Sequence, residues 1–143
     1  MSDMNTAQNE VFGQPFDSLP LEDEMALMLI GNKGIEFLSF LSFTAKSPFR
    51  LEEWAAFLNT TPGQLQHYKE SNFDPIRSDR IIEISLFIKK GVEVFGSEEK
   101  FKIWLRSKIS ALGGKSPKEL LTSTFGIRLL MDELGRIEHG ILA

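Results

Sequence analysis

Polar side chains with strong hydrogen-bonding potential follow a proline near the middle of the chain, in the segment TTPGQLQHYK at residues 60–69. Glutamine can bond adenine through two hydrogen bonds, whereas threonine and lysine suit phosphate oxygens. These residue types at this spacing are therefore candidates for contacting DNA. The candidates are Thr61, Gln64, Gln66, His67 and Lys69.

The segment around these residues, LEEWAAFLNTTPGQLQHYKE, predicts a helix-turn-helix. We expect Ala55, Leu58 and Leu65 to face inward and Asn59 to take the left-handed position of the turn. In a DNA-binding unit of this kind the second helix enters the major groove. Many helical proteins join two helices by a short turn for packing alone, so a purely structural role is the alternative.

The chain ends in GRIEHGILA, which combines two glycines, a mixed-charge patch and an apolar tip. The charged groups could orient against polar groups of a partner while the tip fills an apolar entrance. We expect Gly135 to permit close packing within a last helix and Gly140 to free the final three residues from it. The alternative is that the tip packs on its own domain. The candidate partner-binding residues are Arg136, Glu138, His139, Gly140, Ile141, Leu142 and Ala143.

The residue inventory argues against catalysis. The 143 residues include no cysteine and two histidines, which excludes thiol nucleophiles and thiolate zinc sites and disfavours a histidine-built metal site. No serine or carboxylate stands in a recognisable setting with a base and an orienting group. We therefore predict no catalytic residue, no metal and no cofactor. Because neither a signal peptide nor a membrane span is recognisable, we expect a cytoplasmic protein.

Apolar residues recur at helical spacing and strict two-residue alternation is missing, so we predict an all-α fold. Polar residues that cap helices mark several helix starts, and at three of them a proline follows the cap. At Thr61 and Ser116, the residue three positions after the cap also predicts a capping box. The starts are Thr61 with Pro62 and Gln64, Ser116 with Pro117 and Glu119, Asp74 with Pro75, and Ser97. The chain is predicted to be helical from about residue 21, with helices at 51–58, 64–70, 75–95, 98–107, 118–121 and 126–140.

Charge is distributed unevenly along the chain. The first 24 residues contain six acids and no lysine or arginine, whereas the remainder contains 14 acids and 16 bases. We predict an acidic, mobile leader at 1–24, a domain with the helix-turn-helix at 25–93 and a small helical domain at 94–143. An ordinary solvated surface would also account for the mildly basic balance of the folded part.

Aromatic residues, glycines and a Ser-Pro pair stand at specific positions in the C-terminal third. They are Phe95-Gly96, Trp104-Leu105, Leu112-Gly113-Gly114, Ser116-Pro117, Leu120-Leu121, Gly126 and the run LGRIEHG at 134–140. This stretch resembles the toxin-binding domain of the Xre/MbcA/ParS antitoxin family. Upstream, FDPIRSDRIIEIS is similar to the family's connection between an Xre-like helix-turn-helix and that domain. Two departures are Lys108, where the family often has a proline nearby, and GQLQHYK, where its recognition helix commonly carries arginine.

The resemblance implies an Xre-like helix-turn-helix bundle followed by a small toxin-binding domain, in the antitoxin of a bacterial type II toxin–antitoxin pair. Such antitoxins commonly occlude the active site of a RES-type toxin that degrades NAD, form homodimers and often bind their own operator DNA. The C-terminal residues, 136 and 138–143, are then toxin contacts. The alternative is a stand-alone helix-turn-helix transcriptional regulator without a toxin partner. The resemblance implies no membrane partner.

Overall fold

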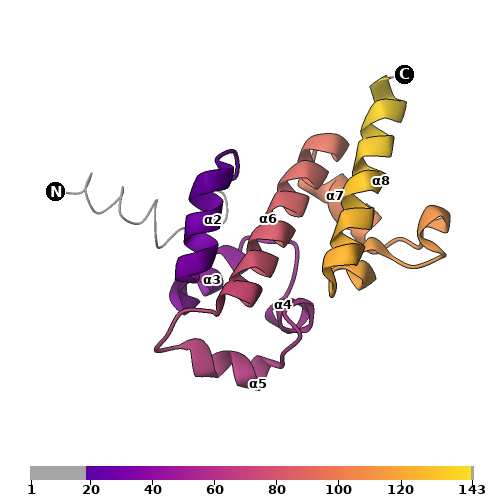
Figure 1. Ribbon diagram of the computed structural model, residues 1–143. Helices are drawn as coiled ribbons and strands as arrows, with labels where there is room; N and C mark the ends of the chain where they lie inside the picture. Colours follow the sequence, from indigo (N-terminus) through magenta and orange to yellow (C-terminus); the bar gives the residue numbers. More distant parts are fainter. Residues whose placement is uncertain (1–18, 143) are drawn as a thin grey trace. The chain divides into compact units, whose positions relative to one another are not determined.

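The computed structural model describes residues 19–142. In this part of the chain the predicted all-α fold is confirmed (Figure 1). This part of the chain contains α-helices and short 3₁₀ helices and no strand. The chain divides into two compact units, Met1–Ile82 and Glu83–Ala143, and the division falls within the long helix α6. The elements are α2 (Glu24–Lys33), α3 (Phe37–Thr44), α4 (Leu51–Phe57), α5 (Pro62–Leu65), η2 (Gln66–Tyr68), α6 (Pro75–Phe95), α7 (Glu98–Leu105), η3 (Ser110–Leu112), η4 (Pro117–Leu120) and α8 (Thr124–Leu142).

The predicted helix starts are confirmed by their hydrogen bonds. Thr61 Oγ1 accepts the N–H of Gln64 at 3.1 Å, and Ser97 Oγ accepts the N–H of Lys100 at 3.2 Å. Asp74 caps α6 in the same way, because its Oδ2 accepts the N–H of Arg77 at 3.2 Å. These bonds satisfy N–H groups that have no partner within the helix.

The two predicted capping boxes have different outcomes. At the start of η4 the box is present, since Glu119 Oε2 accepts the N–H of Ser116 at 2.7 Å. At the start of α5, Gln64 Oε1 accepts the hydroxyl of Thr60 at 2.9 Å instead of reaching the N–H of Thr61. The first turn of α5 is therefore held by the threonine cap and a bond between side chains.

The first unit is built on an aromatic core. The rings of Phe40, Trp54 and Phe73 are buried, with ring centroids 5.7 Å apart for Phe40 and Trp54 and 4.9 Å apart for Phe40 and Phe73. Two hydrogen bonds tie the region where α6 begins to the connection between α2 and α3. Ile35 O accepts the N–H of Phe73 at 2.8 Å, and the hydroxyl oxygen of Ser78 accepts the N–H of Ile35 at 3.0 Å. The N-terminal part of α6 is thereby fixed within this unit.

The second unit packs α7 and α8 with the C-terminal part of α6. Phe101 and Trp104 of α7 are buried, and the ring of Phe87 lies 5.5 Å from that of Phe101 between centroids. At Gly91 of α6 an added Cβ would overlap the ring of Phe101, so only glycine permits this close approach. Leu130 and Leu134 complete the core from α8.

The second helix of the predicted helix-turn-helix is shorter than expected. Instead of a helix at 64–70, α5 ends at Leu65 and continues as the 3₁₀ helix η2. The stacking of Tyr68 on Phe73, with ring centroids 4.5 Å apart, accompanies this change. We attribute the tighter turn to this stacking, because it fixes Tyr68 against the core at the point where an α-helix would have continued.

Further boundary predictions were wrong in part. The helix predicted at 118–121 is the 3₁₀ helix η4, and the one predicted at 98–107 ends at Leu105. The last helix begins at Thr124 rather than Gly126, because the hydroxyl of Ser123 caps it by accepting the N–H of Gly126 at 2.9 Å. Gly126 lies in the first turn, where an added Cβ would overlap the carbonyl oxygen of Leu120.

Both expectations for the glycines near the end of α8 were also wrong. The helix runs through Gly140 to Leu142, so Gly140 does not release the final residues from it. A Cβ at Gly135 would meet no heavy atom of the described residues within 4 Å, so this glycine does not serve close packing against the part of the chain that the structure describes. The predicted leader, residues 1–24, lies largely outside the described residues.

Candidate functional site

The turn between α4 and α5 has the predicted geometry. Ala55, Leu58 and Leu65 are buried, as expected for residues that face inward. Asn59 has φ of 57°, the left-handed conformation that asparagine tolerates better than most residues. The N–H of Thr60 donates to Ala55 O at 2.9 Å and closes the turn. The sequence thus folds locally into two short consecutive helices joined by a hydrogen-bonded turn.

The five predicted DNA contacts all lie on the exposed side of this segment. Thr61 caps α5, Gln64 lies on α5, Gln66 and His67 lie on η2, and Lys69 follows η2. Thr61 and Gln64 take part in the local bonds described above. The side chains of Gln66, His67 and Lys69 are exposed to solvent. The segment therefore presents amide, imidazole and ammonium groups on one short stretch.

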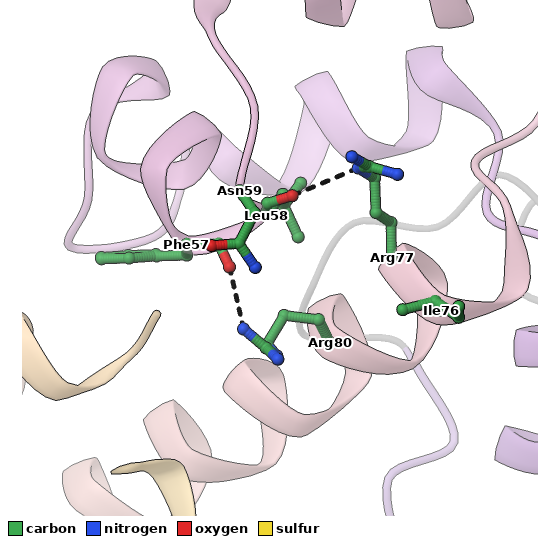
Figure 2. Close-up of a pocket in the computed structure, with 6 residues that line it drawn as sticks. All are labelled: Phe57, Leu58, Asn59, Ile76, Arg77 and Arg80. Atoms are coloured by element: carbon green, nitrogen blue, oxygen red, sulfur yellow. Dashed lines mark hydrogen bonds between the residues drawn. The ribbon is translucent and has the colours of Figure 1, made fainter. Parts of the chain in front are cut away.

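Two arginines of α6 lie beside the same turn, and reasoning from the sequence missed both. Arg77 Nε donates to Leu58 O at 3.2 Å, and Arg80 Nη1 donates to Phe57 O at 3.1 Å. These carbonyls belong to the end of α4, where acceptors lack partners within the helix and cations are favoured. Figure 2 shows both guanidinium groups directed at this helix end, with Asn59 beside them.

These groups line an open pocket of about 110 Å³ (Figure 2). Its walls come from the end of α4, the turn and the first two turns of α6. Two side chains in the wall are cationic and none is acidic. The lining residues are Phe57, Leu58, Asn59, Ile76, Arg77 and Arg80. The three-residue spacing of the arginines could have revealed that they share a face of α6, but only the fold shows that this face meets the turn.

Asp74 holds Arg77 in position. Its Oδ1 pairs with Arg77 Nη1 at 3.2 Å and accepts the hydroxyl of Tyr68 at 3.3 Å. Burial opposes ionisation of Asp74, but the backbone N–H, the guanidinium and the charge of Arg77 outweigh it and hold the pKa of Asp74 below its usual value. Burial raises the pKa of Tyr68, and its hydrogen bond to Asp74 acts in the same direction against the opposing charge of Arg77. At neutral pH the ion pair is therefore formed and the phenol is neutral.

Two of the seven predicted partner contacts at the C-terminus are engaged within the second unit. Glu138 accepts hydrogen bonds from Lys90 Nζ of α6 at 2.8 and 2.9 Å. Arg136 donates to both carboxylate oxygens of Glu133, each at 3.2 Å, while its own side chain remains 66% exposed. Glu138 thus fixes α8 against α6, and Arg136 is held in one orientation at the surface.

The remaining residues of this predicted set lie at the very end of α8. His139 and Gly140 are exposed. Ile141 and Leu142 belong to the last turn of the helix, but their side chains lie outside what the structure describes. Ala143 also lies outside the described residues.

An exposed apolar strip at the start of α8 was not predicted. Phe125 is 66% exposed and Leu129, one turn later on the same face, is 39% exposed. The pattern of buried residues held a signal for it, because Ile127, Leu130 and Leu134 form the apolar face of α8 and leave Phe125 and Leu129 outside it. Aromatic and aliphatic side chains exposed in this way are common in partner-binding surfaces.

The described residues provide no other recognisable chemistry. No group of three or more histidine, aspartate or glutamate side chains among them could hold a metal ion. None of the helices in the described range is long and apolar enough to cross a membrane.

The family match found by comparison with known proteins lies within the second unit. Residues 90–140 match the family described as the antitoxin Xre/MbcA/ParS C-terminal toxin-binding domain. An antitoxin Xre of Yersinia enterocolitica is 32% identical over 75 residues, which cover 52% of this chain and 51% of that protein. An antitoxin Xre of Photorhabdus laumondii is 27% identical over 105 residues, covering 66% of this chain and 71% of that protein. The chain thus matches about half the length of the first relative. Residues 90–140 of this chain are thus similar to the toxin-binding domain of the Xre/MbcA/ParS antitoxins, and the chain is similar to two proteins named antitoxin Xre.

Proposed function

We propose that this protein is the antitoxin of a bacterial type II toxin–antitoxin pair and neutralises its toxin by binding, without catalysis of its own. The observation that carries the proposal is the match of residues 90–140 to a toxin-binding domain, supported by two relatives named antitoxin Xre. We further propose that it acts in the cytoplasm, as a homodimer, on a RES-type toxin that degrades NAD. The resemblance to the family supports these finer points.

The proposed mechanism is occlusion of the toxin's active site by the end of α8. The helix reaches Leu142 without a break, so residues 136–142 form one continuous element. The ion pair of Lys90 with Glu138 fixes this element to α6. A positioned helix end loses less conformational entropy on binding than a flexible tail, which favours affinity.

Co-expression with a RES-type toxin, if one is encoded beside this gene, tests the proposal. We expect the full chain to co-purify with the toxin, protect growth and keep cellular NAD at its normal level. A chain lacking residues 140–143 should lose most of this protection. The matched control Leu38→Ser removes an exposed apolar side chain of the first unit and should protect fully.

Two outcomes separate the parts of this proposal. If the full chain neither co-purifies with the toxin nor protects growth, the antitoxin role is refuted for that toxin. If the truncated chain protects as well as the full chain, binding persists without the tip, and the exposed strip at Phe125 and Leu129 becomes the surface to test.

We also propose that the first unit binds operator DNA and represses the pair's own operon. The supporting observation is the exposed polar segment Thr61–Lys69, with Arg77 and Arg80 beside its turn. A gel-shift experiment with the DNA upstream of the gene, at two salt concentrations, tests this, because phosphate contacts make binding salt-dependent. Salt-sensitive binding in the absence of any neighbouring toxin gene would instead favour the stand-alone regulator.

A further inference from the structure

We propose that the pocket lined by Asn59, Ile76 and Arg77 is a docking site for one phosphodiester of the DNA backbone. The inference rests on the proposed DNA binding and adds a specific site to it. It also supplies arginine contacts from α6, which the segment GQLQHYK lacks.

Arg77 and Asn59 have hydrogen-bond donors that no described residue uses. A guanidinium has five N–H groups, and Arg77 directs Nε to Leu58 O and one Nη1 hydrogen to Asp74. Its Nη2 donates to none of the residues the structure describes. The side-chain amide of Asn59, which is exposed, likewise has no hydrogen bond within the described part of the chain. Donors of this kind suit the two free oxygens of a phosphodiester.

Hydrogen bonds to neighbouring groups pre-organise Arg77 at the pocket. Arg77 is held by Leu58 O on one side and by the ionised Asp74 on the other, so its rotamer is set before any ligand arrives. The left-handed backbone of Asn59 fixes the point at which its side chain leaves the turn. Arg80 adds a second positive charge from the next turn of α6, and none of the pocket's lining residues is acidic. The lining thus carries two cationic groups, of which Arg77 is paired with Asp74 just outside the pocket.

The volume of the pocket and its place beside the turn also suit a phosphodiester. A pocket of about 110 Å³ is much smaller than the roughly 300–1,000 Å³ that drug-sized ligands occupy, so it suits a single small group. It opens beside the turn that leads into Thr61 and α5. At its edge Ile76 is 79% exposed, which provides apolar surface for a deoxyribose next to the bound phosphate. These features favour DNA over a free anion or an acidic protein.

The decisive variant is Ile76→Glu. Because Ile76 is exposed and lies in the first turn of α6, a glutamate there should leave the melting temperature unchanged or raise it. The same carboxylate would repel a phosphate in the pocket. We expect affinity for duplex DNA to fall about tenfold at low salt, with a smaller loss at high salt. Ile76→Gln, which is polar without charge, is the matched control.

A second variant tests the donor itself. Arg77→Gln should weaken DNA binding and reduce the slope of log K against log salt by about one, the loss of one phosphate contact. Lys46→Gln removes an exposed charge from the same unit, away from the pocket, and should change the slope much less. Because Arg77 also caps α4, the Arg77→Gln variant could lose stability, so its melting curve is recorded in parallel. Ile76→Glu remains the primary test.

NMR titration of the unmodified protein with inorganic phosphate completes the experiment, read at Arg77 Nε–H and the Asn59 amide. DNA binding with unchanged affinity and slope in both pocket variants would overturn the inference while leaving the DNA-binding function intact. No DNA binding, with phosphate shifts at these groups, would reduce the pocket to a free-anion site and refute both the DNA-binding proposal and the phosphodiester assignment. If the protein shows no DNA binding and phosphate causes no NMR shifts at these groups, the DNA-binding proposal and the phosphodiester assignment are both refuted. Weakened binding of an acidic partner protein alone would assign the pocket to that partner.

Discussion

Glu119 shows how one side chain links sequence, local structure and pH. Hydrogen bonds from the backbone N–H and the hydroxyl of Ser116 stabilise its carboxylate and outweigh desolvation, and the charges of Lys115 and Lys108 add to them. The pKa of Glu119 is therefore lowered below its usual value. A carboxyl group with a lowered folded-state pKa stabilises the fold above the ordinary pKa of glutamate, about 4.3, and this contribution is lost as the pH falls through the folded-state pKa.

We accordingly expect Glu119→Gln to flatten the loss of stability in acid. The difference in unfolding free energy between the wild-type chain and the variant, measured in urea from pH 7 to pH 3, should shrink as the pH falls. Glu99→Gln is the control, because Glu99 is 84% exposed and its distance to Lys102 is 3.9 Å. A difference that stayed constant over the whole range would show that the carboxylate charge plays no part in the capping box.

At the scale of single helices, two glycines in helices of the second unit have opposite roles. Gly91 of α6 lies against the ring of Phe101, whereas Gly135 of α8 has no heavy atom of the described residues near its missing Cβ. We expect Gly91→Ala to destabilise the fold by about 1–3 kcal/mol through overpacking. Gly135→Ala should stabilise it by about 0.4–1 kcal/mol, since alanine favours helix and reduces the entropy of the unfolded chain.

Thermal and chemical unfolding of the two variants measure this contrast directly. The pair forms an internal control, because both changes add one methyl group within a helix. Equal destabilisation by both substitutions would show that α8 meets a neighbour at Gly135 that the described residues do not contain. Toxin binding by Gly135→Ala, measured in parallel, reports whether the partner approaches at this position.

The elements that sequence predicted well are those fixed by local chemistry. Thr61, Ser97 and Asp74 cap their helices through bonds within three residues, and Asn59 takes the turn conformation that its own side chain tolerates. The contacts of Arg77 depend instead on the packing of α6 against the end of α4, across 19 residues of chain. No local pattern encodes such a contact, so the pocket could not be predicted from spacing alone.

At the scale of the whole molecule, charge is separated along the chain. The net charge is −4, yet all six acids of residues 1–24 precede a mildly basic remainder. Exposed charges influence ligands over about one Debye length, roughly 10 Å at 0.1 M salt. If the first unit binds DNA as proposed, the acidic segment attached to it should therefore lower its affinity for DNA of any sequence.

We expect Asp3→Asn, Glu10→Gln and Asp17→Asn together to raise affinity for a random duplex several-fold at low salt, with little effect at high salt. Fluorescence anisotropy at two salt concentrations measures this. The control set Asn5→Ala, Gln8→Ala and Gln14→Ala alters the same segment without changing its charge. An equal rise in both sets would show that the effect is not electrostatic.

Because α8 continues through Gly135 and Gly140, these glycines affect how often the last turns of the helix open. Each glycine costs a helix about 1 kcal/mol relative to alanine, so the last turns of α8 open more often than the turns around Leu130. Amide hydrogens of residues 136–140 should consequently exchange quickly with solvent in the free protein. A partner that covers this end would slow their exchange, so hydrogen exchange at the helix end would report whether the protein is free or bound.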